Sequence, residues 1–271
     1  MVAVTLKDAK MELELKNLAE LALLAAQEGA QILLSHLGAS EEDLVVRAKR
    51  DGSLVSAADI ASHRAILKHL QRTDIPVISE EGDLPTVRER QSWPWFWLVD
   101  PLDGTESFLN HRSGFAVNIA LCNADGPVVG VVADPLGNRA FVGVQEWGAE
   151  EVQLDDLGVR KELAPGEAKR PFRMVLSRNE SAPIADLLPP GIREEDVLAE
   201  PVSGALKFCL LATGEAEIHS RTGPYMEWDC AAGDAVLRSI GLTTYDRRTG
   251  KQLRYNSTTL RVEGLWVSRI E

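Results

Sequence analysis

The chain has few cysteines, and their arrangement does not suggest pairing. Cys122, Cys209 and Cys230 are odd in number, far apart and each set in apolar sequence. A free cysteine in such a setting behaves as a small core side chain, and this spacing argues against both a disulfide framework and a metal site. We therefore expect core thiols in a protein of the reducing cytoplasm.

Long hydrophobic runs are also missing. The stretch Leu21–Ala26 is far shorter than the roughly 20 residues that cross a membrane, and acidic residues precede it, unlike the basic start of a secretory signal. We interpret it as part of an amphipathic helix from about Met11 to Leu37 and expect no membrane span. The apolar stripe of this helix consists of Leu18, Leu21, Ala25, Ile32 and Leu33.

Basic residues are scarce relative to acidic ones. The chain has 29 Lys and Arg against 41 Asp and Glu, which gives a formal net charge of −12. A nucleic-acid polymer binds through basic surface, so we expect no such partner. A small anionic ligand can still bind locally, through metal ions and backbone N–H groups.

The 271 residues can bury a large core and allow one large domain or two modest ones. Strand-like runs at 115–122, 128–133 and 140–144 are separated by Gly-containing turns, which predicts an antiparallel meander. The segment 146–170 is rich in charge and Gly, so we expect an exposed hairpin and a boundary there. Beyond residue 172 strands alternate with helices. We predict an α/β or α+β protein with subdomains at 1–165 and 166–271.

The most informative segment is Trp97–Phe108, an apolar run followed by Asp100-Pro-Leu-Asp-Gly-Thr105. We expect a buried strand to end at Asp100 and a tight Pro/Gly turn to bring Asp103 beside it. Two carboxylates so close repel each other unless a cation lies between them. Oxygen ligands without nearby His or Cys favour Mg²⁺ or Mn²⁺ over Zn²⁺.

Three further acids stand where helices or strands are expected to begin or end. Glu80 follows the short strand-like run 75–79, and Asp229 opens a helix of small residues that ends at Gly241. Asp59 opens a helix that runs to Leu70, after a turn-like segment at 51–53. The loops at such ends commonly carry the chemistry of α/β proteins.

Three motifs resemble those of the lithium-sensitive, magnesium-dependent phosphomonoesterases. They are Ser79-Glu-Glu-Gly82, Asp100-Pro-Leu-Asp-Gly-Thr105 and Trp228-Asp-Cys-Ala-Ala-Gly233. The superfamily includes inositol monophosphatase, fructose-1,6-bisphosphatase and 3'(2'),5'-bisphosphate nucleotidase, and the resemblance runs from about Asp51 to Asn256. It implies a layered αβαβα sandwich with the active site between its halves, two or three Mg²⁺ ions, Mn²⁺ as a substitute, and inhibition by Li⁺.

The resemblance also implies metal ligands. Asp100 would bridge two ions. Glu80 and the backbone carbonyl of Leu102 would complete the first site, and Asp103 and Asp229 the second.

The same resemblance implies how water is activated. Thr105 would hydrogen-bond the attacking water, and Asp59 would accept from Thr105 or from the water itself. Taken alone, Asp59 would be only a helix N-terminal carboxylate that complements the helix dipole. Gly104 and Thr105 would start a short helix whose N–H groups hold the substrate phosphate.

Within the superfamily, Val202–Leu211 and Gly250–Asn256 look most like the bacterial bisphosphate nucleotidases, since inositol monophosphatases usually lack a lysine at the position of Lys207. A second substrate phosphate would need a basic group, and Lys207 is the first candidate. The alternative is a solvated helix lysine. The segment Glu106-Ser107-Phe108 departs from the Lys-Glu-Phe run that is usual in those nucleotidases, which weakens the assignment of the substrate.

Other residues are assigned to the substrate more loosely. Gly204 would let the backbone approach, and Ser177, Arg178 and Asp229 would add contacts. The trio Arg221, Tyr225 and Glu227 would line a base or ribose pocket.

Several conspicuous aromatic residues have a simpler interpretation. We expect Trp93, Trp95 and Trp97 to serve packing. We expect His63 and His69 to lie at the surface or between helices, because they lack metal-ligand spacing.

The expected function is hydrolysis of the 3'-phosphate of 3'-phosphoadenosine 5'-phosphate to AMP and phosphate, with this small nucleotide as the partner. An inositol monophosphatase or another sugar phosphatase is the enzymatic alternative. A sensor that binds Mg²⁺ and a nucleotide is the non-enzymatic one, although it would not need Thr105 and Asp59. The sequence leaves open whether the chain forms a homodimer.

Overall fold

A computed structural model describes residues 6–39, 44, 46–48, 54–110 and 114–270. The turn expected at 51–53 lies outside these residues. The helices are α1 (Leu6–His36), α2 (Ala57–Leu70), α3 (Val87–Arg90), α4 (Thr105–Leu109), α5 (Ile184–Leu187), α6 (Leu206–Thr213) and α7 (Glu227–Ser239), with a 3₁₀ turn η1 (Glu194–Asp196). The strands of the first half are β1 (Arg47–Ala48), β2 (Leu54–Val55), β3 (Val77–Ser79), β4 (Trp95–Asp103), β5 (Ala116–Asn123), β6 (Gly126–Asp134), β7 (Arg139–Val144), β8 (Gly148–Gln153) and β9 (Arg160–Glu162). The later strands are β10 (Phe172–Leu176), β11 (Val197–Pro201), β12 (Ile218–Arg221), β13 (Tyr225–Met226), β14 (Tyr245–Asp246), β15 (Arg261–Val262) and β16 (Leu265–Ser268).

The larger sheet has seven strands in the order β3-β4-β5-β6-β7-β8-β9. The pair β3–β4 is parallel, and all the other neighbours are antiparallel. The predicted meander is confirmed by β5, β6 and β7, and the predicted hairpin by β8 and β9. Because β3 is the end strand of this order, only one of its edges pairs with another strand of the sheet.

The smaller sheet has the order β11-β10-β12-β16-β14 and mixes parallel with antiparallel pairs. Of its neighbouring strands, only β10 and β11 are consecutive in the chain, whereas α6 lies between β11 and β12 and α7 between β13 and β14. Two small ribbons, β1–β2 and β13–β15, stand outside both sheets.

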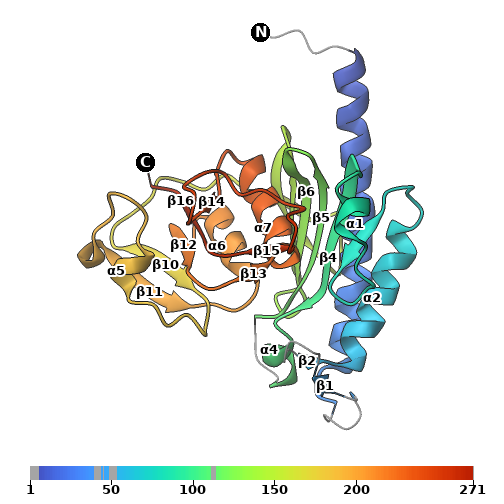
Figure 1. Cartoon of the computed structure of the whole chain (residues 1–271), viewed down its shortest axis with the longest axis horizontal. Helices are drawn as coiled ribbons and strands as arrows, with labels where there is room; N and C mark the ends of the chain where they lie inside the picture. Colours follow the sequence, from blue (N-terminus) through green and yellow to red (C-terminus); the bar gives the residue numbers. More distant parts are fainter. Residues whose placement is uncertain (1–5, 40–43, 45, 49–53, 111–113, 271) are drawn as a thin grey trace.

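The elements stack in layers (Figure 1). Helices α1 and α2 cover one face of the large sheet, and α7 packs on β5 and β6 from the other face, beside α6. The small sheet follows, with the short α5 beyond it. This is the predicted αβαβα order, which is confirmed. None of the helices in the described part of the chain combines the length and the apolar character that crossing a membrane would require.

Two large hydrophobic clusters hold these layers together. One lies between α1, α2 and the large sheet, and it includes Leu23, Leu33 and Val117. The other fills the space between the large sheet, α6, α7 and the small sheet, and it joins Phe96 to Val175. The two halves therefore share a core, and the subdomain boundary at residues 165 and 166 stays a prediction.

The first helix is longer than predicted, since it begins at Leu6 rather than near Met11. Residues 6–10 contain good helix formers and neither Gly nor Pro, so nothing in them stops the helix. Of the predicted apolar stripe, Ala25 and Leu33 are buried, whereas Leu18, Leu21 and Ile32 are half-buried. All three cysteines are buried and free, as predicted.

Candidate active site

The aspartates of the central motif share one strand. Strand β4 runs on through Asp103, so the prediction that it ends at Asp100 is wrong. Asp100 lies opposite Asn118 of β5 and Asp103 opposite Ala116, so three steps on β4 match two steps on β5. Side chains alternate along a strand, and this β-bulge therefore returns Asp103 to the face that Asp100 occupies.

Proline explains where the bulge falls. Pro101 has no N–H for the ladder, and within sheets proline is confined to edges, strand starts and bulges. The bulge is also held from outside, because the Ser62 hydroxyl of α2 donates to the Pro101 carbonyl at 2.9 Å. The N–H of Leu102 donates to Asp100 Oδ1 at 3.0 Å, which fixes that carboxylate.

Three carboxylates converge beside this bulge. Ligand oxygens of Glu80, Asp100 and Asp229 all lie within 4.8 Å of one another. Burial, and then the neighbouring carboxylates of Glu80 and Asp103, raise the pKa of Asp100 well above its usual range. Burial and the same neighbours raise the pKa of Asp229. The charged forms of these acids are unfavourable here unless a cation compensates them.

The donor set fits a hard divalent cation. The cluster consists of carboxylates alone, without His or Cys, which suits Mg²⁺ or Mn²⁺. The cluster can therefore hold a metal ion.

Asp103 lies next to this cluster but is not one of the three closest acids. Its Oδ2 accepts from the side-chain amide of Asn118 at 3.2 Å and from the backbone N–H of Ala205. Burial raises the pKa of Asp103, while the Lys207 ammonium opposes that shift. Asp103 thus joins the acid cluster to the loop before α6.

Asp59 uses its two carboxylate oxygens for different partners. Oδ2 accepts from the backbone N–H of Ser56 at 2.8 Å and from the Ser56 hydroxyl at 2.6 Å, which caps α2. Oδ1 accepts from the Thr105 hydroxyl at 3.2 Å. The structure therefore places the predicted pair together. It also places Asp59 in the first turn of α2, as the alternative of a carboxylate that complements the helix dipole expects. Burial raises the pKa of Asp59 although these hydrogen bonds oppose the shift.

Gly104 connects the bulge to α4. Its φ of 89° lies in the left-handed region, and an added Cβ would come within 2.9 Å of the Gly114 carbonyl oxygen. Helix α4 begins at Thr105 and is five residues long. Glycine is required here by both backbone conformation and space.

A cavity of about 400 Å³ adjoins the acids. Asp103 and Asp229 line it together with most of the predicted substrate residues. These are Gly104, Ser177, Arg178, Gly204 and Lys207. Arg221 and Tyr225 also line it. The sequence therefore assigned to the substrate a group of residues that the fold brings together.

Glu227 does not belong to this cavity, so its assignment to a base or ribose pocket is wrong. It is buried, and its carboxylate accepts from the backbone N–H groups of Asn256 and Ser257 at 2.5 and 2.8 Å. The buried Arg90 donates to Asn256 Oδ1 at 2.6 Å and to the Thr258 carbonyl at 2.7 Å. These contacts tie the start of α7, which carries Asp229, to α3.

Lys207 is only 1% exposed, which rules out the alternative of a solvated lysine. Its ammonium donates to the carbonyls of Val202 at 3.2 Å and Gly204 at 2.5 Å. Burial lowers the pKa of Lys207 to about 8, although Asp103 opposes the shift. An ammonium has three N–H donors, and these two carbonyls accept from two of them.

Two functional neighbours were missed from the sequence. Asn118 is buried in β5 and donates to Asp103. Its signal was a polar residue within an otherwise apolar strand. Ser203 accepts from Arg178 Nε at 2.6 Å and from the Ser107 hydroxyl at 3.2 Å. Its signal was its place in the segment Val202–Leu211, from which only Gly204 and Lys207 were assigned a role.

The histidines of α2 pack inside the protein. Nε2 of His69 lies 2.5 Å from Oε2 of Glu28 in α1, which confirms that His69 packs between helices. His63 is buried, and its Nδ1 lies 2.9 Å from the Ser79 hydroxyl. Trp97 is buried in the core as expected, whereas Trp93 and Trp95 are half-buried.

The fold and the site together define a protein class. A sequence model described as the Inositol monophosphatase family matches residues 14–268. The chain belongs to this family. Its structure is similar to that of an inositol monophosphatase from Anabaena, with a TM-score of 0.69, 20% identity and coverage of 95% of this chain and 92% of the other.

Other similarities point to one branch of the family. The chain is 38% identical to the 3'(2'),5'-bisphosphate nucleotidase CysQ of Escherichia coli O157:H7 over 234 residues, which cover 86% of this chain and 91% of the relative. It is 40% identical to the CysQ of Salmonella typhimurium over 210 residues, 76% of this chain and 81% of that one. The crystal structure of CysQ from Bacteroides thetaiotaomicron matches with a TM-score of 0.80 and 31% identity, covering 94% of this chain and 98% of that one.

Proposed function

We propose that this chain is a magnesium-dependent phosphomonoesterase that removes the 3'-phosphate of 3'-phosphoadenosine 5'-phosphate and releases AMP and phosphate. One observation carries the proposal. Asp229 belongs both to the carboxylate cluster and to a cavity that Arg178 and Lys207 line. The cationic side chains of Arg178 and Lys207 can contact a second substrate phosphate that the carboxylate cluster and its metal ions do not hold. The similarity to bisphosphate nucleotidases supports the same substrate.

We propose Mg²⁺ as the cofactor, in two or three sites, with Mn²⁺ as a substitute. The carboxylates of Glu80, Asp100, Asp103 and Asp229 and the backbone carbonyl of Leu102 would hold these ions. When bound, such ions supply a nucleophile from water at neutral pH and neutralise charge that develops on the phosphoryl oxygens.

The protein's own groups move the proton. Hydrolysis joins a water oxygen to phosphorus and breaks the bond between phosphorus and the 3'-oxygen. Because the Thr105 hydroxyl donates to Asp59, its oxygen lone pairs can accept a hydrogen bond from the attacking water. The proton can then pass to Asp59, whose raised pKa makes it a better base. The departing 3'-oxygen takes up a proton from solvent water and leaves as the 3'-hydroxyl of AMP.

The cavity would hold the remainder of the substrate. The ammonium of Lys207 and the guanidinium of Arg178 would contact the second phosphate. The Ser177 hydroxyl is held by Tyr225 at 2.9 Å at the same cavity. Gly104 and Gly204 also line this cavity and add no side chain to it.

A substrate panel tests the proposal. Phosphate release is measured with Mg²⁺ and three substrates: 3'-phosphoadenosine 5'-phosphate, inositol 1-phosphate and fructose 1,6-bisphosphate. We expect kcat/KM for the nucleotide to exceed the others by at least about tenfold, the effect of roughly 1.4 kcal/mol from one additional charged contact. We also expect Li⁺ to inhibit turnover.

The alternatives give different results in the same panel. Faster turnover of inositol 1-phosphate or of the other sugar phosphate would establish a sugar phosphatase. Binding of the nucleotide without any phosphate release would establish a sensor. Light scattering tests the homodimer, and cell fractionation tests the cytoplasmic location.

A further inference from the structure

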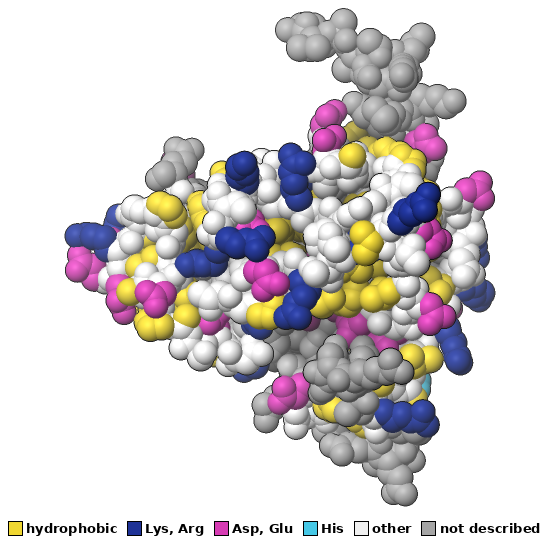
Figure 2. Space-filling view, viewed as in Figure 1, with side chains coloured by type: hydrophobic (Ala, Val, Ile, Leu, Met, Phe, Trp, Pro, Cys, Tyr) yellow, Lys and Arg dark blue, Asp and Glu magenta, His cyan; other side chains and the backbone are white. Residues whose placement is uncertain are grey.

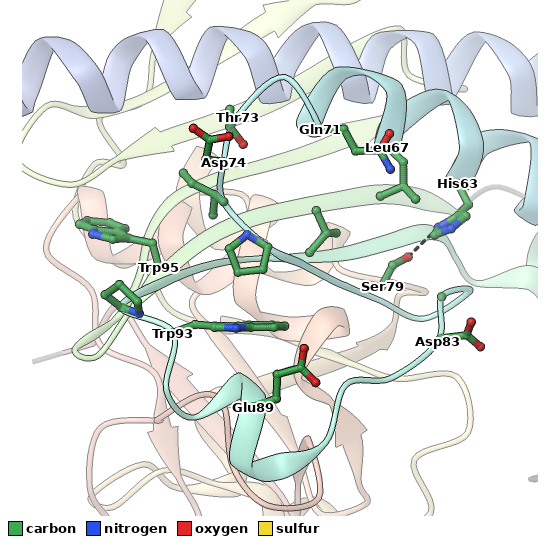
Figure 3. A pocket seen from close by; sticks show the side chains of 15 residues that line it. His63, Leu67, Gln71, Thr73, Asp74, Ser79, Asp83, Glu89, Trp93 and Trp95 are labelled. Carbon is green, nitrogen blue, oxygen red and sulfur yellow. Dashed lines mark hydrogen bonds between the residues drawn. The ribbon is translucent and has the colours of Figure 1, made fainter.

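A second cavity of about 990 Å³ lies beside β3, more than twice the volume of the candidate substrate cavity. None of the candidate site residues lines it. Its walls come from the end of α2, the segment 73–79, the loop after β3, α3 and the start of β4 (Figure 3). It is therefore a separate feature of the fold.

The cavity combines aromatic surface with negative charge. Trp93 and Trp95 line it and are half-buried, so part of each indole stays accessible. Asp74, Asp83 and Glu89 line it as well (Figure 3), and all three are exposed. None of the described residues that line it is Lys or Arg. Indole faces and carboxylates both attract organic cations.

The floor of the cavity offers backbone hydrogen bonds. The carbonyl of Pro76 accepts from Trp97, and the N–H of Glu80 donates to Val99, so even-numbered residues of this segment bond to β4. In a parallel pair the alternate residues turn their N–H and C=O away from the neighbour. Val77 therefore presents its backbone groups on the outer edge of β3, which lines the cavity.

We propose that this groove binds an extended basic peptide segment of a partner protein. The peptide backbone adds to the outer edge of β3, and its Lys or Arg side chains contact Trp93, Trp95 and the three carboxylates. Addition to a strand edge is an established mode of peptide recognition. The volume also favours a peptide, because it lies at the upper end of the ~300–1,000 Å³ of ligand pockets, and a single small cation would fill little of it.

Fluorescence anisotropy with labelled eight-residue peptides tests the proposal. The first peptide alternates lysine with valine, the second replaces lysine by glutamate, and the third is the first with alternate backbone amides N-methylated. We expect saturable binding of the first, none of the second, and binding of the third weaker by at least about fivefold, the effect of one lost hydrogen bond. No saturable binding of the first peptide, or equal binding of the third, overturns the proposal.

Charge variants locate the site. The double variant Asp74→Asn, Glu89→Gln should weaken binding of the first peptide by at least about fivefold, the effect of losing one desolvated cation contact. The matched control Glu167→Gln, Glu194→Gln removes the same charge from exposed positions that do not line the groove, and it should change binding less than twofold. Equal weakening by the control would show unspecific attraction to an acidic protein and overturn the proposal.

Two other occupants are separate outcomes. Spermidine that displaces the peptide and binds as tightly would show a site for small cations. Self-association of the chain that the Asp74→Asn, Glu89→Gln variant abolishes would show a second copy in the groove. Either result overturns the assignment to a partner peptide.

Discussion

Asp59 and Asp229 are placed by the same local rule. Each is the third residue of its helix, and one oxygen of each carboxylate accepts from the N–H of the residue before the helix, at 2.8 Å from Ser56 and 2.9 Å from Met226. This hydrogen bond fixes the side-chain conformation and leaves the second oxygen directed elsewhere. In Asp59 that oxygen accepts from Thr105, and in Asp229 the carboxylate joins the acid cluster.

The sequence could place single site residues but not their neighbours. Apolar runs followed by Pro, Gly or small residues locate Glu80, Asp100 and Asp229 near the ends of elements, which is a local signal. The burial of Lys207 depends on the loop before α6 and on the neighbouring layer, which no local pattern describes. The hydrogen bond from Asn118 to Asp103 depends on strand register, which is also a long-range property.

Replacing Asp100 by Asn should weaken metal binding but stabilise the fold of the metal-free chain. Replacing a residue that only supports a metal ligand lowers the metal affinity by up to about 100-fold. Asp100 is itself a proposed ligand, so we expect a larger loss. In the metal-free chain the same change should raise the urea midpoint, because it removes a buried charge that Glu80 and Asp103 repel. Calorimetry and urea unfolding measure the two effects. Asp134→Asn is the control, since Asp134 is buried beside Arg139 and outside the cluster, and a variant that retains most of the metal affinity would contradict the bridging role.

Lys207 should make kcat/KM fall on the alkaline side of its pH profile. Its ammonium loses its proton near pH 8, so a contact with substrate phosphate is present below that pH and lost above it. We expect kcat/KM for the nucleotide to fall about tenfold per pH unit above pH 8. Lys207→Arg should remove this fall, because a guanidinium stays protonated. A pH profile that is unchanged in the arginine variant would exclude Lys207 as its origin.

At the scale of elements, β4 and α7 position the carboxylates of the site, since β4 carries Asp100 and Asp103 and α7 carries Asp229. The sequence signalled both, but with errors that follow from long-range contacts. It placed the end of β4 at Asp100, because a Pro/Gly turn normally ends a strand, whereas pairing with β5 carries β4 past the proline through a bulge. It identified α7 from its small residues but not how close that helix comes to the sheet.

Helix α7 lies unusually close to the large sheet. A Cβ added at Gly130 of β6 would lie 2.2 Å from the Ala232 carbonyl oxygen, and one at Gly143 of β7 would lie 2.4 Å from the Val236 Cα. On the opposite side, a Cβ at Gly233 would lie 2.5 Å from the Phe208 ring. The helix that carries Asp229 is thus fixed from both sides by glycines.

Gly130→Ala should therefore affect both stability and the metal site. We expect a loss of about 1–3 kcal/mol in the free energy of unfolding, typical of overpacking, and weaker Mg²⁺ binding because α7 must shift. Urea unfolding and calorimetry check these effects. Gly166→Ala is the matched control, since its added Cβ would contact nothing within 4 Å. Normal Mg²⁺ affinity in a destabilised Gly130→Ala chain would show that the position of α7 does not limit the site.

At the scale of the whole molecule, the carboxylate cluster joins distant parts of the chain. Asp100 comes from β4 of the large sheet, Glu80 from the turn directly after β3, and Asp229 from the helix between the two sheets. The layer order follows from the family resemblance rather than from periodicity. The order of the small sheet is not predictable from local sequence, because its order, β11-β10-β12-β16-β14, does not follow the order of the strands along the chain.

Binding of Mg²⁺ should therefore stabilise the entire fold. A ligand that binds only the native state at 100 times its Kd adds about 2.7 kcal/mol to the free energy of unfolding. We expect the urea midpoint to rise with Mg²⁺ in a single transition, and Asp229→Asn to abolish most of the rise. NaCl at equal ionic strength is the control for screening of the net charge. An equal effect of NaCl would show that screening, rather than a bound ion, stabilises the protein.

Charged side chains of both signs are scattered over the visible face of the molecule, among apolar and uncharged polar surface (Figure 2). The cations that we propose to contact phosphate, Arg178 and Lys207, instead line a cavity, where Lys207 is almost fully buried. An acidic protein can therefore bind a small anion without attracting a polyanion along its surface.

One proposed metal ligand lies in the bulge of β4 and cannot be removed by changing a side chain, because it is the backbone carbonyl oxygen of Leu102. The bulge breaks the regular ladder with β5 between Asp100 and Asp103, which releases the Leu102 carbonyl from the usual strand pairing. The side chain of Leu102 meanwhile packs into the core. Alanine scanning at this position would report a packing defect and leave the oxygen in place. Only a change to the backbone itself, such as an ester in place of the following amide, would reveal what that oxygen holds.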